Sequence, residues 1–132
     1  MLTLYVLPSE GNATNIIKTA KSVGNVLKQA IPVKCISEIN SDVETPWYAV
    51  LYDNEVADAQ LEESFRPFLV FKGADVLKLY KRIGHGPYVF SIAPRIFRSG
   101  IRLRENSLIP ENCDGLKFET VLNGWLENID ED

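Results

Sequence analysis

Cysteine and histidine are scarce in this chain of 132 residues, which contains two cysteines and one histidine. Cys35 and Cys113 lie far apart, form no CxxC pair, and have only His85 as a possible companion. Structural zinc sites need a full set of closely spaced thiols and imidazoles, and redox motifs need paired thiols. The sequence therefore predicts neither kind of site.

Long apolar runs are also lacking. The longest is far shorter than the roughly 20 residues that a membrane-spanning helix needs. Residues 1–5 have neither the basic start nor the cleavage site of a secretory signal. We therefore expect a cytoplasmic protein. With 45% hydrophobic and 24% charged residues, residues 1–132 are expected to form one globular domain.

Acidic residues outnumber basic residues, which gives a net charge of −4, but the basic residues are unevenly distributed along the chain. The segment from Lys72 to Arg104 has eight basic residues and one acid, a local charge of +7, so the remainder carries −11. Such a segment can face an anionic ligand or neutralise acids elsewhere in the fold, and the sequence leaves both open. The acidic total and the lack of a reading motif do not favour nucleic-acid binding.

Apolar patterning in the first half predicts a strand, a helix and a second strand. Residues 2–7 are nearly all apolar, and Pro8 closes them as a strand. Apolar positions from Ile16 to Leu27 recur at helical spacing, and residues 33–39 read as the next strand. This order predicts a right-handed βαβ unit with a parallel strand pair.

In the second half, Asp58 is placed to cap a helix, and period-two alternation predicts a half-buried strand at 76–80. A strand at 88–92 would complete a hairpin, and apolar residues at helical spacing predict a final helix over 118–129. These elements predict an α/β fold: a three-layer-like domain with a mixed, mainly parallel sheet and helices packed on it.

The most informative stretch runs from Trp47 to Glu55. Six apolar or aromatic residues, typical of a strand buried on both faces, are followed by Asp53, Asn54 and Glu55. Carboxylates at i and i+2 lie on the same side of an extended chain, where both can bind Mg²⁺ or Mn²⁺. The alternative is a turn in which these acids favour the dipole of the following helix.

Two stretches resemble the GT-A glycosyltransferases of the family 2 kind: Leu4-Tyr5-Val6-Leu7-Pro8-Ser9, and the acid-ended strand from Trp47 to Glu55. The resemblance implies a truncated GT-A-like domain, since the unit that normally lies between Ile39 and Trp47 is missing. It also implies a nucleotide-sugar donor, Mg²⁺ or Mn²⁺ on Asp53 and Glu55, and glycosyl transfer to an unknown acceptor.

The implied site includes residues beyond the metal ligands. Arg95 and Arg98 suit neutralisation of the donor diphosphate, because guanidinium groups bind such oxygens bidentately. Asp114 or Glu119 would be the catalytic base that deprotonates the acceptor, although helix capping explains both acids as well. The full set expected to contact the nucleotide-sugar is Pro8, Ser9, Glu10, Asn54, Arg95 and Arg98.

A second hypothesis assigns no catalysis. The chain would be a non-enzymatic interaction protein that binds a protein partner through the basic strand region or the C-terminal helix. Residues 93–98 and 123–126 also resemble segments of small phage-encoded proteins, a resemblance that implies no mechanism.

Overall fold

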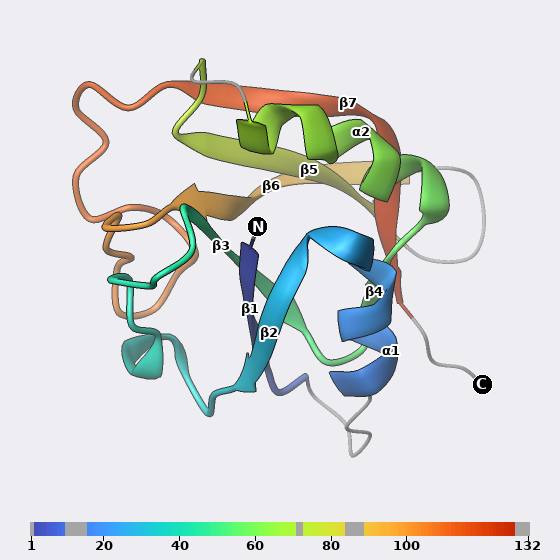
Figure 1. Ribbon diagram of the computed structural model, residues 1–132, viewed down its shortest axis with the longest axis horizontal. Coiled ribbons are helices and arrows are strands. Elements are labelled where there is room, and N and C mark those ends of the chain that lie inside the picture. The colour runs from blue at the N-terminus through green and yellow to red at the C-terminus, as the bar shows by residue number, and fades with distance from the viewer. Residues whose placement is uncertain (1, 10–15, 71–72, 84–88, 129–132) are drawn as a thin grey trace.

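Residues 2–9, 16–70, 73–83 and 89–128 are described in the structure, a computed structural model (Figure 1). Two α-helices, α1 (Ile16–Ser22) and α2 (Ala59–Val70), and two short 3-10 turns, at Gly24–Val26 and Ile36–Glu38, are described. The described strands are β1 (Leu2–Leu7), β2 (Leu27–Pro32), β3 (Trp47–Tyr52), β4 (Glu55–Ala57), β5 (Val76–Ile83), β6 (Val89–Arg98) and β7 (Phe118–Asn128).

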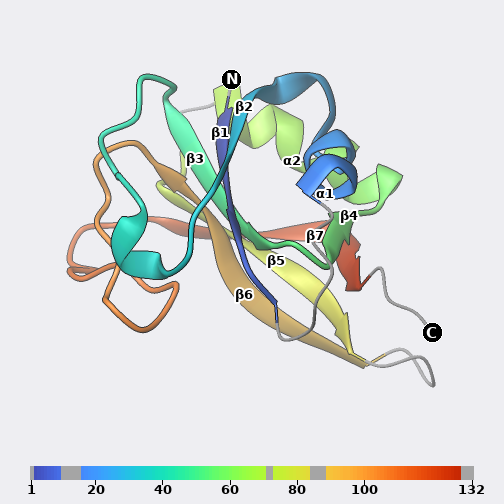
Figure 2. The same cartoon turned by 90° about the horizontal axis from the view of Figure 1, so that it is seen from below.

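The strands form one 7-stranded sheet in the order β2-β1-β3-β6-β5-β7-β4. The pairs β1–β2, β1–β3 and β5–β7 are parallel, whereas β3–β6, β5–β6 and β4–β7 are antiparallel. The sheet curls into a half-barrel with both helices on its concave side (Figures 1 and 2). The predicted three-layer α/β fold with a mainly parallel sheet is therefore wrong, and so is the GT-A-like architecture.

The main hydrophobic core fills the concave side of the sheet. Side chains of α2 pack there against alternate residues of the central strands, because strand side chains alternate between faces. Trp47 on β3 is fully buried, and its Nε1–H donates to the Leu69 carbonyl of α2 at 2.9 Å. The largest contributors are Leu2, Leu4, Trp47, Leu61, Phe65, Leu77, Leu79, Ile96 and Leu126.

The convex face of the sheet is covered at one end by two irregular segments, residues 33–46 and 99–117, instead of by helices (Figure 2). Their apolar side chains pack on a second cluster that includes Tyr5, Tyr48 and Phe97. Strand β3 is therefore buried on both faces, as its unbroken apolar run predicted.

The first strand and its parallel pairing are confirmed, but the predicted partner at 33–39 is wrong, because β1 pairs with Leu27–Pro32. Helix α1 ends at Ser22, and Gly24 follows with φ of +77°, a left-handed conformation that stops a helix and favours glycine. Leu27, expected in the helix, instead starts β2 and pairs with Leu2. Residues 33–39, the predicted strand, are irregular and contain a 3-10 turn.

The predicted C-terminal helix over 118–129 is wrong, because residues Phe118–Asn128 form strand β7. Leu79 of β5 pairs with Val121, and Lys81 then pairs with Leu126, so β7 contains a bulge between these two pairs. The extra residues shift the buried positions out of period two, which produced the helix-like spacing of apolar residues. Gly124, at φ of +84°, lies in this bulge.

The other predicted elements agree more closely with the structure. Asp58 caps α2 through its Oδ1, which accepts a hydrogen bond from the Leu61 N–H at 2.8 Å. Strands β5 and β6 form the expected antiparallel hairpin, but β6 extends to Arg98, beyond the predicted strand at 88–92. Residues 84–88 between these two strands, which include His85, lie outside the described residues. None of the described helices is long and apolar enough to cross a membrane.

Candidate functional site

Glu55, predicted as a metal ligand, is fully buried at the start of β4 in contact with two cations. Its Oε1 lies 2.5 Å from Arg95 Nη1, and its Oε2 lies 3.0 Å from Arg95 Nη2, a bidentate pair. Lys81 Nζ forms a further ion pair with Oε2, and the Tyr52 N–H donates to Oε1 at 2.8 Å. We refer to Glu55, Arg95 and Lys81 as the buried charge cluster.

Asp53, the other predicted metal ligand, is also buried, with 4% of its surface exposed. Its Oδ1 accepts hydrogen bonds from the Ser9 N–H at 3.0 Å and from the Ser9 hydroxyl at 2.5 Å. The Asp53 N–H donates to the Leu7 carbonyl at 2.9 Å, which ties the end of β3 to the end of β1. Asp53 therefore anchors Ser9, just after the end of β1.

The expected Mg²⁺ or Mn²⁺ site on Asp53 and Glu55 is not formed. The Glu55 oxygens are occupied by Arg95 and Lys81, whose positive charges also repel a metal cation. Within the described part of the chain, no group of three or more His, Cys, Asp or Glu side chains could hold a metal ion. The interpretation of Asp53 and Glu55 as a pair of metal ligands is therefore wrong, and the basis for metal-dependent glycosyl transfer is lost.

The other residues expected to contact a nucleotide-sugar are distributed over several elements. Arg98 lies over the Trp47 ring, 4.3 Å from its centroid, pairs with Asp75 at 3.4 Å and donates to the Ala74 carbonyl. Arg95 belongs to the buried charge cluster, so neither arginine presents a free basic surface. Pro8 is exposed after β1, Asn54 is half-buried in the β3–β4 turn, and Glu10 lies outside the described residues.

The two candidate catalytic bases lie on different features. Asp114 is exposed in the irregular segment 99–117, where its N–H donates to the Asn112 side chain at 2.9 Å. Glu119 is exposed near the start of β7 and lines a shallow hollow of about 230 Å³ with Phe68 and Ala74. Neither residue caps a helix, because the segment that follows them is a strand.

The buried charge cluster determines the ionisation of Glu55. Burial raises the pKa of the Glu55 carboxyl. The charges and hydrogen bonds of Arg95 and Lys81 together lower this pKa by more than burial raises it, so it lies below its ordinary value of 4.5. Glu55 is therefore ionised at neutral pH, and the cluster is a structural ion pair between β4, β5 and β6.

Acidification is expected to destabilise the wild-type protein more than a Glu55→Gln variant. Because the pKa of Glu55 is lower in the folded protein than its ordinary value of 4.5, ionised Glu55 stabilises the fold above pH 4.5. This stability is lost as the pH falls through the folded-state pKa of Glu55. Because glutamine does not titrate, the difference in unfolding free energy between the two proteins should shrink with falling pH. Urea unfolding from neutral pH down to about pH 3 measures this difference, and a constant difference would contradict the assignment.

A hollow lies at the bulge in β7, where residues from the convex face of β5 and β6 meet the first turn of α2. The hollow has a volume of about 430 Å³ and is lined by residues of α2, β5, β6 and β7. Phe90 and Trp125 lie with ring centroids 5.3 Å apart, and Tyr80 and Phe90 with centroids 6.0 Å apart. The lining residues are Gln60, Tyr80, Phe90, Leu122, Asn123, Gly124 and Trp125.

Apolar side chains around this hollow are exposed to solvent. Leu122 is 72% exposed, Ile92 50% and Phe90 36%. Ile92 pairs with Tyr80 across β5 and β6, so the two side chains share a face of the sheet. We call Tyr80, Phe90, Ile92, Leu122 and Trp125 the convex apolar patch.

The sequence did not predict the convex apolar patch. Leu122 and Trp125 lie in the predicted helix over 118–129, where they were counted among the apolar residues at helical spacing. The signal that could have located it is the dipeptide Asn123-Gly124 in the middle of that predicted helix. Glycine weakens a helix interior, and in a strand it marks a bulge.

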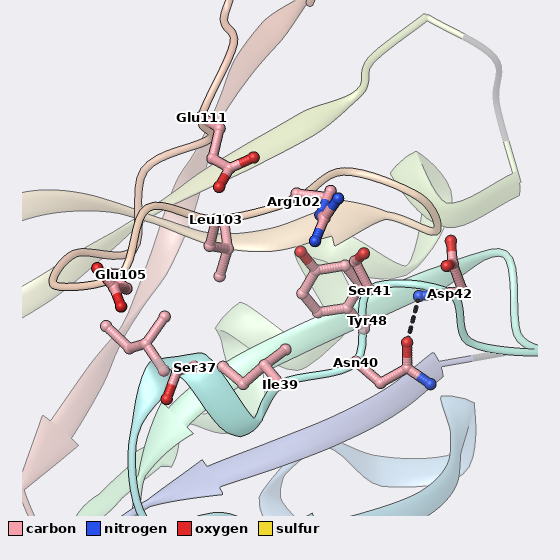
Figure 3. Close-up of a pocket in the computed structure, with 11 residues that line it drawn as sticks. Ser37, Ile39, Asn40, Ser41, Asp42, Tyr48, Arg102, Leu103, Glu105 and Glu111 are labelled. Atoms are coloured by element: carbon pink, nitrogen blue, oxygen red, sulfur yellow. Dashed lines mark hydrogen bonds between the residues drawn. The ribbon is translucent and has the colours of Figure 1, made fainter.

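A third feature is a cleft of about 370 Å³ between the two irregular segments that cover the convex face (Figure 3). One wall is formed by residues 36–42 and the other by residues between 102 and 111, with Tyr48 of β3 between them. We call this feature the interloop cleft.

No family model matches the chain, and neither a curated protein nor a solved structure matches it. The functional assignment therefore rests on the geometry of these features.

Proposed function

We propose that the protein is a non-enzymatic interaction protein that binds a protein partner through the convex apolar patch. The supporting observation is the 72% exposure of Leu122 beside a hollow whose walls include Tyr80, Phe90 and Trp125. Contiguous exposed apolar surface of this kind is a mark of protein–protein contact, and aromatic residues are enriched where partners insert an anchoring side chain.

Two observations favour a protein partner over a small ligand. The apolar surface extends beyond the hollow to Ile92, so an occupant of the hollow alone would leave apolar area exposed. At the rim, Arg82 Nη1 and Glu127 Oε1 form an ion pair at 3.3 Å, which supplies the polar border typical of protein interfaces. The partner in this proposal places a leucine, phenylalanine or tryptophan side chain in the hollow.

The proposal moves the contact surface from the two places expected from the sequence. Arg95 and Arg98 are committed to contacts within the fold, and the expected C-terminal helix is strand β7. A cytoplasmic location remains part of the proposal, supported by Cys35 and Cys113, which are both exposed and unpaired.

The experiment selects a random peptide library on the immobilised protein and measures the enriched peptides against a Leu122→Asp variant. We expect enriched peptides to contain an apolar anchor and to bind the variant at least about tenfold more weakly, because the aspartate carboxylate would have to be desolvated in the interface. Leu122 is exposed, so the variant should fold normally, which circular dichroism checks.

Val70→Asp is the matched control. Val70 is 76% exposed on α2 and does not line the hollow, so this change introduces the same charge at an equally exposed apolar position. Peptide binding should be unaffected by it. Failure to enrich any apolar peptide, or equal losses in Leu122→Asp and Val70→Asp, would refute the proposed surface.

A further inference from the structure

Hydrogen bonds fix the geometry of the interloop cleft, both between its two irregular segments and between these segments and the sheet. The Gly100 N–H donates to the Ser41 carbonyl at 2.7 Å, and the Ser99 hydroxyl donates to the Val43 carbonyl at 2.9 Å. The Tyr5 hydroxyl donates to the Asn40 carbonyl at 2.8 Å, and the Tyr48 hydroxyl donates to the Ile101 carbonyl. The cleft is therefore formed before any ligand binds, which lowers the entropic cost of binding.

The wall formed by residues 102–111 is itself tied together as a short hairpin. Leu103 and Pro110 form an isolated antiparallel bridge. The Glu111 N–H donates to the Arg102 carbonyl at 2.8 Å, and the Arg104 N–H donates to the Ile109 carbonyl at 2.9 Å. These bonds place Arg102 and Glu111 opposite each other on the hairpin, and both line the cleft (Figure 3).

The cleft has one positive group and an excess of negative groups. Among the described residues that line it, Arg102 is the one lysine or arginine, whereas Asp42, Glu105 and Glu111 supply three carboxylates, a formal charge of −2. Among the described residues, no carboxylate forms an ion pair with the Arg102 guanidinium. Its bidentate donor face is therefore available to a ligand carboxylate.

Apolar side chains lie between these charged groups. Ile36 and Ile39 line one wall and Leu103 lines the other. They provide a surface for an aliphatic stem, as long cationic side chains require when their charged ends reach polar groups. A complementary ligand therefore combines one carboxylate, an aliphatic stem and net positive charge.

We propose that the interloop cleft binds a carboxylate that belongs to a basic amino acid, either free or at the C-terminus of a peptide. Arg102 binds the carboxylate, and the cleft acids bind the cationic groups of the ligand. A free basic amino acid carries one negative and two positive charges, which opposes the charge of the cleft.

Isothermal titration calorimetry with defined probes tests this site. L-arginine has all three features, agmatine lacks the carboxylate, and L-norleucine lacks the cationic side group. We expect L-arginine or the peptide Gly-Gly-Arg to bind, and agmatine and norleucine to bind at least about tenfold more weakly. Comparison of free arginine with Gly-Gly-Arg distinguishes the two sources of the ligand.

Variants of the cleft residues make the test specific. Arg102→Ala should weaken arginine binding but should not weaken agmatine binding, because agmatine is a dication that Arg102 repels, whereas Glu111→Gln should weaken both. Arg104→Ala is the matched control, because Arg104 is exposed on the same hairpin but does not line the cleft. Leu122→Asp should bind arginine normally, which separates this site from the proposed protein interface.

The inference would be overturned if neither L-arginine nor Gly-Gly-Arg gave heat of binding at millimolar concentration, or if arginine and agmatine bound the wild type with equal affinity. Equal weakening by Arg102→Ala and Arg104→Ala would overturn it as well, because a general loss of positive charge would then explain the effect.

Discussion

Gly124→Ala is expected to destabilise the protein by roughly 3–5 kcal/mol, since it combines left-handed backbone strain with a steric clash. A Cβ atom on Gly124 would lie 2.2 Å from the backbone nitrogen of Leu61 and 2.4 Å from its Cα. These atoms belong to the first turn of α2 and cannot rotate away as a side-chain end can. The bulge and the capped end of α2 would have to separate, although Asp58 Oδ1 joins them by accepting from Leu61 N–H and Trp125 N–H.

The control for this prediction is Gly115→Ala. Gly115 has a similar φ of +78°, but no atom of the described residues lies within 4 Å of the position where its Cβ would be. Only the backbone strain then applies, which costs roughly 1–2 kcal/mol. Urea unfolding followed by tryptophan fluorescence measures both variants. Equal losses for the two variants would show that β7 does not approach α2 as closely as the structure indicates.

Glu55→Ala is expected to destabilise the protein by roughly 3–5 kcal/mol, because it leaves buried cations without their counter-charge. Arg95 is only 6% exposed and Lys81 is half-buried, so neither can be fully solvated in the folded state without moving. The change also removes the acceptor of the Tyr52 N–H. Equilibrium unfolding in urea at neutral pH measures the loss.

Glu127→Ala is the matched control for the buried charge cluster. It removes the carboxylate of the Arg82–Glu127 pair, in which the side chains are 21% and 39% exposed. Ion pairs exposed to this extent contribute about 0–1 kcal/mol. A cost for Glu55→Ala as small as that of Glu127→Ala would contradict the view that Glu55 joins β4, β5 and β6.

The same cluster explains why the basic segment misled the prediction of function. From the sequence, Arg95 and Arg98 could either face an anionic ligand or neutralise acids within the fold. The structure shows the second alternative: Arg95 pairs with Glu55, and Arg98 pairs with Asp75 and stacks on Trp47. Charge reversal at these two positions would therefore test stability and not partner binding.

Local patterns predicted those elements whose periodicity is uninterrupted. Strands β1, β3 and β5 and helix α2 follow from unbroken apolar runs, period-two alternation or a capped helical repeat. The C-terminal strand could not be predicted in this way, because the β7 bulge moves Val121 and Leu126 out of alternation. A short helix and a bulged strand can show the same apolar spacing over about 10 residues.

The candidate site could be predicted only in part, for a different reason. The sequence identified Asp53, Glu55 and Arg95 as unusual residues, and all three are buried polar groups in the structure. Whether a buried carboxylate binds a metal or a guanidinium depends on its neighbours in space. Glu55 meets Arg95 across 40 sequence positions, and Asp53 meets Ser9 across 44.

By itself the sequence determined the apolar strand from Trp47 to Tyr52, its burial on both faces, the parallel pairing of β1 and the cap of α2. Each depends on residues close together in the chain, whose hydrophobicity and hydrogen-bonding capacity act over one or two turns or strand repeats. The tertiary structure alone decided the curl of the sheet, the neutralisation of Glu55 and the exposure of Leu122 beside Trp125. These depend on contacts between distant segments, and on a bulge whose glycine packs against another element.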